Sequence, residues 1–410
     1  MNSNSFVANI GLDWADEKHD FCLLERGSSS YEYGLFEHSP ESITQWATDL
    51  SNRFNGQPIA ICLELKSGPI VACLQQFKFI TLYFIPPKGF AKYRESFCQS
   101  GAKDDPTDAF FQLDYLLKHP ERLREVTLDS EETRIIQQLV EQRKHFLDER
   151  VKRTNHIREC LKRYYPLVLE LFNDMDTHIF CDFIKRWPNL AKLKSARKRT
   201  LVEFFKTHRS ANKKLLNQRL KLIHNAMALT EDLGIIIPQQ QCVLSLIKQL
   251  EVTLGILKDY DNQIANRFDQ HKDKALFESL PGAGPVLAPR LLAAIGSDRQ
   301  RFSDASEIIN FAAISPVIVR SGKKSWTHWR FKCSTFVRQT FVEWAYQTTR
   351  FSYWAKEFYI KKRELGKSHQ ATLRALAFKW IRIIFRCWQD RTVYDEATYL
   401  FALQRRHQKI

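Results

Sequence analysis

Short apolar runs separated by polar turns occupy the first 85 residues, a pattern typical of strands joined by brief connections. They predict the order strand, strand, strand, helix, strand, helix, strand. The strands are expected over residues 6–12, 19–25, 31–36, 59–65 and 80–85. The two helices are expected to start at Pro40 and Pro69, because proline is favoured at the first position of a helix. Residues 1–125 are therefore expected to form one α/β domain.

This order of elements matches an RNase H-like (RuvC-like) fold, in which the first and fourth strands are neighbours. Asp13 follows the first predicted strand and Glu64 lies at the end of the fourth, so the two carboxylates would emerge side by side. After a loop, the segment Gly101–Ala109 begins a helix, with Asp105 as its N-cap and Asp108 in its first turn. Such caps are common without any functional role, so the helix start alone does not identify a site.

Four carboxylates brought together would repel one another unless a cation neutralised them. Mg²⁺ or Mn²⁺ suits oxygen ligands, and two such ions can activate an attacking oxygen and stabilise a leaving one in phosphoryl transfer. The cluster therefore predicts hydrolysis or transesterification of a phosphodiester. Four other acids nearby are expected to be solvated or capping residues: Asp16, Asp20, Asp104 and Asp114.

Two long helices are predicted in the middle of the chain, residues 126–270. The first follows Ser130 and keeps its apolar residues near one face for more than 25 residues, and the second is expected over residues 239–259. Helices of this length are typical of a coiled coil or a helical hairpin. Dimerisation and packing within its own chain fit the first helix equally well, and the second can return antiparallel to it.

Composition adds a polyanionic partner to this picture. The 410 residues carry a net charge of +16, which favours nucleic acid over an anionic membrane surface. There is no run of 18 apolar residues and no signal-peptide pattern, so a membrane protein is not expected. We expect a cytoplasmic protein associated with the nucleoid. The nine cysteines show no CxxC spacing, which indicates neither a disulfide framework nor a zinc ribbon.

Basic residues are concentrated in one part of the middle segment. Between residues 185 and 221, thirteen Lys and Arg stand against one acid, Glu203. A run of charge is usually a solvated face. Here Trp187, Phe204 and Phe205 are interleaved with it, which favours a folded module that presents a basic surface to phosphates.

Residues 271–410 are expected to form a mostly α domain with a helix-hairpin-helix-like segment and a β-hairpin. Gly282 and Gly284 precede a short helix whose backbone N–H groups can hold a phosphate, although a C-cap and tight turn would use the same glycines. Two strands are expected in residues 315–334, joined at residues 320–325. Basic and aromatic side chains share a face there, and the expected nucleic-acid contacts are Arg320, Lys323, Lys324, His328, Arg330 and Lys332.

Ser321 stands at the tip of this hairpin. On residue chemistry alone it is a turn serine, because no obvious base lies near it in the sequence. His328 is the one neighbouring group that could activate it, and a histidine satisfied within its strand is the ordinary interpretation.

Several motifs resemble those of one family of bacterial insertion-sequence transposases, often called IS-one-ten. GLDWA contains Asp13, LELKSG contains Glu64, and KDDPTDA contains Asp105 and Asp108, where the family has its DEDD metal site. SLPGAGPVLAPRLLAAIG, SPVIVRSGKK, WTHWRFKCSTFVRQTFVEWA and RALAFKWIRIIFRCW resemble its C-terminal transposase domain. The family's nucleophile is a serine before a glycine in that domain. The resemblance covers nearly the whole chain and implies that Ser321 is this nucleophile.

The resemblance also implies a mechanism and partners. Ser321 would attack a DNA phosphate to form a covalent phosphoserine link, while Mg²⁺ (or Mn²⁺) at the acidic cluster stabilises charge. The implied partners are donor and target DNA, a bridge RNA that guides the enzyme, and further copies of the chain in a dimer or tetramer.

Two other functions remain open. One is a metal-dependent RNase H-like nuclease or junction resolvase in which Ser321 is structural. The other is a nucleic-acid-binding protein whose acidic site has decayed, which would bind with a steep salt dependence and cleave nothing.

Overall fold

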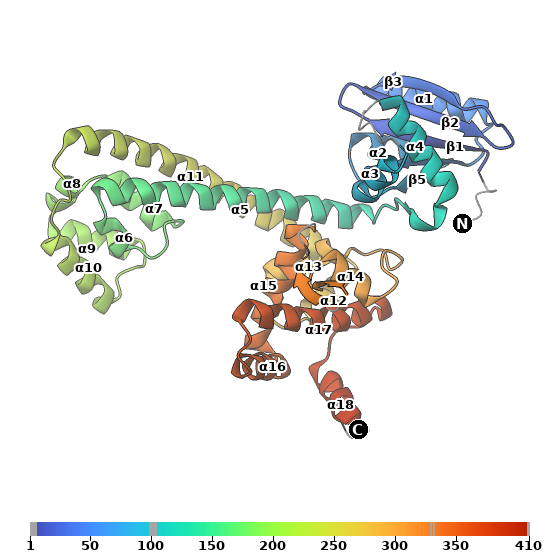
Figure 1. Cartoon of the computed structure of the whole chain (residues 1–410). Helices are drawn as coiled ribbons and strands as arrows, with labels where there is room; N and C mark the ends of the chain where they lie inside the picture. The colour runs from blue at the N-terminus through green and yellow to red at the C-terminus, as the bar shows by residue number, and fades with distance from the viewer. Residues whose placement is uncertain (1–5, 98–104, 323, 329, 331–332, 408–410) are drawn as a thin grey trace. The chain divides into compact units, whose positions relative to one another are not determined.

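The chain divides into two compact units, Met1–Leu128 and Asp129–Ile410. A computed structural model describes residues 6–97, 105–322, 324–328, 330 and 333–407 (Figure 1). Within these described residues, no helix has the length and apolar character needed to cross a membrane.

A six-stranded sheet of order β3-β2-β1-β4-β5-β6 forms the centre of the first unit. β1, β2 and β3 pair antiparallel, whereas β4 and β5 run parallel to β1. The predicted order of three strands, helix, strand, helix and strand is confirmed. The elements are β1 (Ala8–Trp14), β2 (Lys18–Glu25), β3 (Glu32–Glu37), α1 (Pro40–Arg53), β4 (Ile59–Leu63), α2 (Pro69–Leu74), β5 (Ile80–Phe84), α3 (Pro87–Glu95), α4 (Asp105–Lys118), a 3-10 turn (Pro120–Arg122) and β6 (Arg124–Glu125).

The sheet is covered by helices on both faces because alternate residues of its central strands are apolar or small on both sides. Ile10 and Leu12 of β1 belong to one core cluster with residues of α1 and α2. Gly11 points to the opposite face, where α4 crosses. A Cβ at Gly11 would lie 2.0 Å from the carbonyl oxygen of Ala109, so only glycine allows α4 to come this close to β1.

One helix of this unit was not expected. The sequence predicts a loop from Pro86 to the Asp105 helix, but residues 87–95 form α3. Pro87 occupies its first turn, and Phe90 is its buried anchor. A nine-residue helix with one apolar anchor has too weak a periodicity to be recognised from sequence.

Two long helices, α5 (Glu131–Tyr164) and α11 (Leu233–Asp269), run antiparallel in the second unit (Figure 1). The direction follows from two contacts: Arg143 of α5 pairs with Asp261 of α11, and Cys160 lies beside Cys242. The antiparallel return that the sequence allowed is thus observed, and the apolar face of α5 packs within its own chain. Ser130 caps α5 as expected, with its side chain accepting a hydrogen bond from the Thr133 N–H.

Five short helices connect α5 to α11 and enclose a separate aromatic-rich core. They are α6 (Leu167–Leu171), α7 (His178–Arg186), α8 (Leu190–Lys194), α9 (Lys198–Thr207) and α10 (Lys213–Asn225). The fully buried residues of this core include Phe180, Phe183 and Phe205. The basic run therefore belongs to a folded helical module, as the interleaved aromatic residues indicated.

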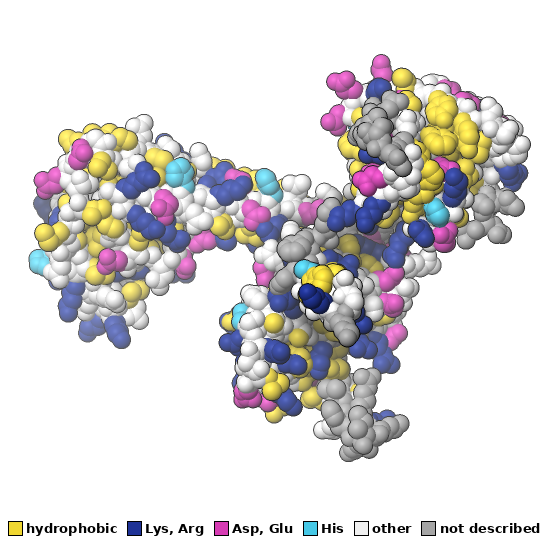
Figure 2. All heavy atoms as spheres, viewed as in Figure 1, with side chains coloured by type: hydrophobic (Ala, Val, Ile, Leu, Met, Phe, Trp, Pro, Cys, Tyr) yellow, Lys and Arg dark blue, Asp and Glu magenta, His cyan; other side chains and the backbone are white. Residues whose placement is uncertain are grey.

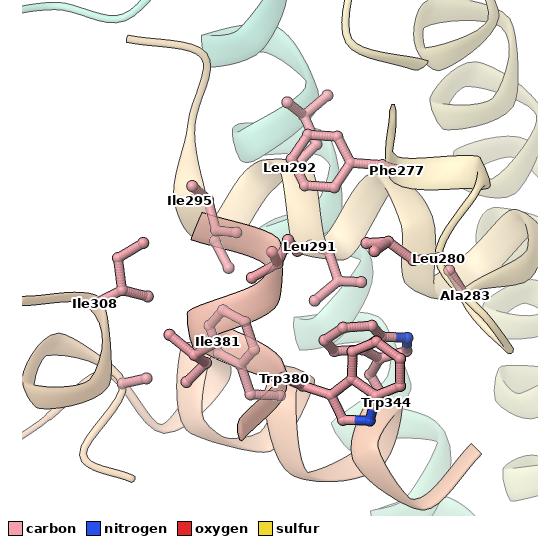
Figure 3. Close-up of a cluster of buried hydrophobic side chains, with 14 of the residues drawn as sticks. Phe277, Leu280, Ala283, Leu291, Leu292, Ile295, Ile308, Trp344, Trp380 and Ile381 are labelled. Atoms are coloured by element: carbon pink, nitrogen blue, oxygen red, sulfur yellow. The ribbon is translucent and has the colours of Figure 1, made fainter. Parts of the chain in front are cut away.

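The C-terminal part packs around tryptophans. Its elements are α12 (Lys274–Glu278), α13 (Gly284–Ile295), α14 (Ala305–Phe311), β7 (Val317–Ser321), β8 (Lys324–His328), α15 (Thr335–Phe351), α16 (Tyr353–Glu364), α17 (His369–Asp390) and α18 (Glu396–His407). Figure 3 shows Trp344 of α15 and Trp380 of α17 beside Leu291 of α13. The Trp380 indole N–H donates to Thr348, so this buried ring satisfies its polar atom.

Candidate active site

The ends of two adjacent strands bring Asp13 and Glu64 to the same face of the sheet. β1 and β4 pair in parallel with Gly11 opposite Cys62, and the two acids each lie two residues further on. Because side chains alternate along a strand, both acids share the face that α4 covers. Burial, and after it the charge of Glu64, raises the pKa of the Cys62 thiol above its usual range.

Helix α4 carries Asp108 and Gln112 over this face, one turn apart. Asp108 is 4% exposed and Gln112 is fully buried. The Gln112 amide nitrogen lies 3.4 Å from the Asp13 carboxylate, which ties α4 to the end of β1. The other amide atom, Gln112 Oε1, is buried without a hydrogen-bond partner. An unpaired buried acceptor is costly, so a donor or a cation is expected to meet it.

Arg94 of α3 neutralises Asp108. One guanidinium nitrogen lies 2.8 and 2.7 Å from the two Asp108 carboxylate oxygens. Sequence reasoning did not single out Arg94, because it lies in a segment expected to be a loop. It also passed over Gln112, although its place four residues after Asp108 is the helical spacing that shares a face.

The remaining acids divide into exposed and buried ones. Asp105 begins α4, and its side chain lies outside the described part of the chain, as does Asp104. Asp16 is exposed, as expected. Asp20 and Asp114 are each only 6% exposed, which corrects the expectation that they are solvated or capping. Asp20 lies directly across from Asp13 in the β1–β2 pair and forms an ion pair with Lys18 at 3.3 Å, whereas Asp114 accepts from Tyr93.

Ser321 is the last residue of β7 and is exposed at the tip of a tight hairpin. Ser321 pairs with Lys324, so the connection is two residues long and shorter than the expected join at residues 320–325. His328 pairs with Val317 at the opposite end of the hairpin, four residues and about 13 Å away along the strand. His328 is therefore wrong as the base that would activate Ser321 within this hairpin.

The rest of the expected basic face is only partly described. Lys323 and Lys332 lie outside the described residues. β8 ends at His328, so Arg330 lies beyond the strand rather than on its face, where it donates to Asn310. Arg320, Lys324 and His328 are exposed, and Trp326 is 42% exposed.

The two glycines of the C-terminal turn have different surroundings. A Cβ on Gly282 would lie 2.9 Å from Phe351 and 3.1 Å from the backbone of Gln347, and its φ is +70°. Packing against α15 thus requires glycine there whether or not a phosphate binds. Gly284 also has a positive φ, of +55°, but faces open space.

Helices α6 to α10 form a basic module, residues 167–225. Most of its Lys and Arg side chains are exposed, but not all of them (Figure 2). Arg219 is 7% exposed, and its guanidinium lies 4.8 Å from the centre of the Phe205 ring and donates to the carbonyl of Leu171. Lys185 pairs with Asp182 and Glu251. These two basic residues therefore stabilise the module itself.

Comparison with known proteins identifies the enzyme class. A family model described as a transposase matches residues 10–166, which include the acidic cluster. A second, described as the transposase IS116/IS110/IS902 family, matches residues 274–360, which include the hairpin. The chain belongs to the IS110/IS116 family of transposases. It is an enzyme of DNA transposition.

One relative of the transposase aligns along nearly its whole length, and others align over part of it. A protein of Streptomyces coelicolor assigned as a mini-circle transposase for IS117 is 26% identical over 405 residues, 97% of each chain. A 42 kDa protein of the insertion element IS900 of Mycobacterium paratuberculosis is 28% identical over 169 residues, 40% of this chain and 42% of the relative. A 44.8 kDa protein of the insertion element IS116 of Streptomyces clavuligerus is 27% identical over 156 residues, 38% of this chain and 39% of the relative.

Proposed function

We propose that the transposase is a DNA recombinase that combines a DEDD metal site in an RNase H-like domain with a serine nucleophile. The observation that supports this proposal is that Asp13 and Glu64 follow paired residues of β1 and β4 on the face that α4 crosses, and that α4 carries the buried Asp108. In this proposal the chain has three domains, residues 1–125, 126–270 and 271–410. Asp105 is the fourth acid of the metal site. As the resemblance implies, the partners are donor and target DNA, a bridge RNA and further copies of the chain in a dimer or tetramer.

The donor set fits a divalent cation such as Mg²⁺ or Mn²⁺. Carboxylate oxygens and an amide oxygen are the ligands that such ions prefer. The buried Gln112 Oε1 supports the fit, because a cation held by Asp13 would give it a partner. When bound, the ion supplies electrostatic stabilisation of the phosphate and the leaving oxygen. Arg94 holds Asp108 in position and must share it with, or yield it to, the cation.

The serine step joins protein to DNA. The Ser321 Oγ forms a bond to phosphorus, the bond from phosphorus to one bridging oxygen breaks, and that DNA oxygen leaves with a proton. Lys324, the cross-strand partner of Ser321, is suited to hold the phosphate. Because His328 is at the other end of the hairpin, the Ser321 proton would pass to a group other than His328. A base supplied by another part of the chain, or by another copy of it, would fit a site completed by folding or assembly.

The nucleic-acid contacts belong to the same proposal. The exposed Arg320, Lys324 and His328, with Arg330, Gly282 and Gly284, would contact phosphates, as would Lys323 and Lys332. The basic module would add sequence-independent affinity. Neither surface distinguishes DNA from the guide RNA, since phosphate contacts carry no sequence information.

The experiment that tests the proposal is denaturing electrophoresis of the purified transposase with labelled donor and target DNA, its RNA and Mg²⁺. A labelled protein–DNA adduct that requires the cation supports the serine recombinase. Cleavage without an adduct would leave the nuclease or resolvase, which the same acidic cluster favours. Salt-sensitive binding with no cleavage would leave a nucleic-acid-binding protein.

Replacing Gln112 tests the metal fit separately from catalysis. Gln112→Leu keeps the buried volume but removes both amide atoms, so we expect Mn²⁺ binding, followed by electron paramagnetic resonance, to weaken by about 10- to 100-fold. Gln75→Leu is the matched control, because Gln75 Oε1 is also buried without a partner in the same unit. Equal Mn²⁺ affinity in wild type and Gln112→Leu would remove Gln112 from the site.

A further inference from the structure

Three metal-ligating side chains meet where α5 and α11 enter the basic module. His156 and Cys160 lie one turn apart on α5, and Cys242 comes from α11. Their ligand atoms all lie within 4.8 Å of one another. Among the described residues, no other His, Cys, Asp or Glu side chains form a group of three this close. All three residues belong to the second unit, so they are separate from Asp13, Glu64 and Asp108.

The distances match those of a tetrahedral zinc ion. Cys160 Sγ and Cys242 Sγ are 3.8 Å apart, and Cys242 Sγ is 3.9 Å from His156 Nε2. With Zn–S bonds of about 2.3 Å and tetrahedral angles, two sulfur ligands of one zinc lie about 3.8 Å apart. A disulfide would require the sulfurs to approach to about 2.05 Å. The observed spacing therefore suits a shared metal better than a covalent bond.

The surroundings also favour a structural metal over a redox cysteine pair. Cys160 is 5% exposed and Cys242 is partly buried, whereas His156 is exposed. Thiolate and imidazole ligands select zinc over Mg²⁺ or Ca²⁺.

We propose that His156, Cys160 and Cys242 bind one Zn²⁺ ion that joins α5 to α11, with water in the fourth position. Both thiols release a proton to solvent, and each sulfur and the imidazole nitrogen donate an electron pair to the ion. The two cysteines are 82 residues apart, and the segment between them contains the whole basic run. The ion would close this segment at its base and stabilise the module that it forms.

The test is metal analysis of the full-length transposase, purified under reducing conditions and dialysed against Zn²⁺. We expect wild type to bind about one more zinc ion per chain than Cys242→Ser does. Substitution by Co²⁺ should give a thiolate-to-metal charge-transfer band that is absent in Cys242→Ser. Cys73→Ser, at a partly buried cysteine of the first unit, should keep both signals. Circular dichroism checks that the variants are folded.

A second variant distinguishes binding from misfolding. Loss of a residue that only supports a metal ligand lowers metal affinity by about 10- to 100-fold. His156→Asn removes a proposed ligand itself, so the loss of zinc affinity should be larger. Its neighbour on the exposed side of α5, Asn155, provides a control in Asn155→Ala, which should bind zinc as wild type does. The proposal is overturned if reduced wild type binds no metal, if mass spectrometry finds a Cys160–Cys242 disulfide, or if the cobalt spectrum survives in Cys242→Ser.

Discussion

Cleavage of DNA by the transposase in Mg²⁺ is expected to fall at least about 1,000-fold in Asp13→Asn, because a metal at the phosphate supplies several kcal/mol of transition-state stabilisation. Asparagine keeps the shape of the side chain and its contact with Gln112 but removes the charge that holds a cation. DNA binding, measured by filter retention, should change little, since the basic surfaces proposed to bind phosphates lie elsewhere. Quantified cleavage of end-labelled DNA provides the measurement.

Asp16→Asn is the matched control for this prediction. Asp16 is exposed in the turn after β1, and its substitution removes the same charge from the same region. Wild-type cleavage by Asp13→Asn, or equal losses in the two variants, would rule out the metal role of Asp13. Asp20→Asn extends the comparison, because Asp20 is buried directly across from Asp13.

The covalent protein–DNA adduct is expected to disappear in Ser321→Ala. Alanine removes the oxygen that would form the bond to phosphorus, so no other property of the hairpin needs to change. Ser321 is exposed and makes its backbone pairing with Lys324 through main-chain atoms, so the fold and its melting temperature should be preserved. Denaturing electrophoresis with labelled DNA detects the adduct.

Ser325→Ala serves as the control in the same hairpin. Ser325 is also exposed, and it pairs with Arg320 one position from the tip. An adduct that persists in Ser321→Ala would exclude this serine as nucleophile. Metal-dependent cleavage that is unchanged in Ser321→Ala, with no adduct in wild type, would favour the nuclease.

Local patterns were sufficient for the framework of the first unit. Short apolar runs between polar turns and the proline starts predicted the strands, α1 and α2 up to β5, and the end of each strand predicted where Asp13 and Glu64 emerge. The long helices followed from the period of their apolar residues, whereas the sequence left open whether the first packs within its own chain or in a dimer. The catalytic and binding roles of the predicted residues stay predictions.

By itself, the sequence determined the elements whose apolar residues repeat over several turns or strands, together with the acids and the serine that its motifs contain. Only the tertiary structure decided that Arg94 neutralises Asp108, that Gln112 reaches Asp13, and that Cys160 meets Cys242. Periodicity reports which face of an element is apolar, because burial there is stabilised by many neighbours at once. A contact between two polar side chains depends on how closely their elements approach, as Gly11 permits for α4, and no local pattern specifies that distance.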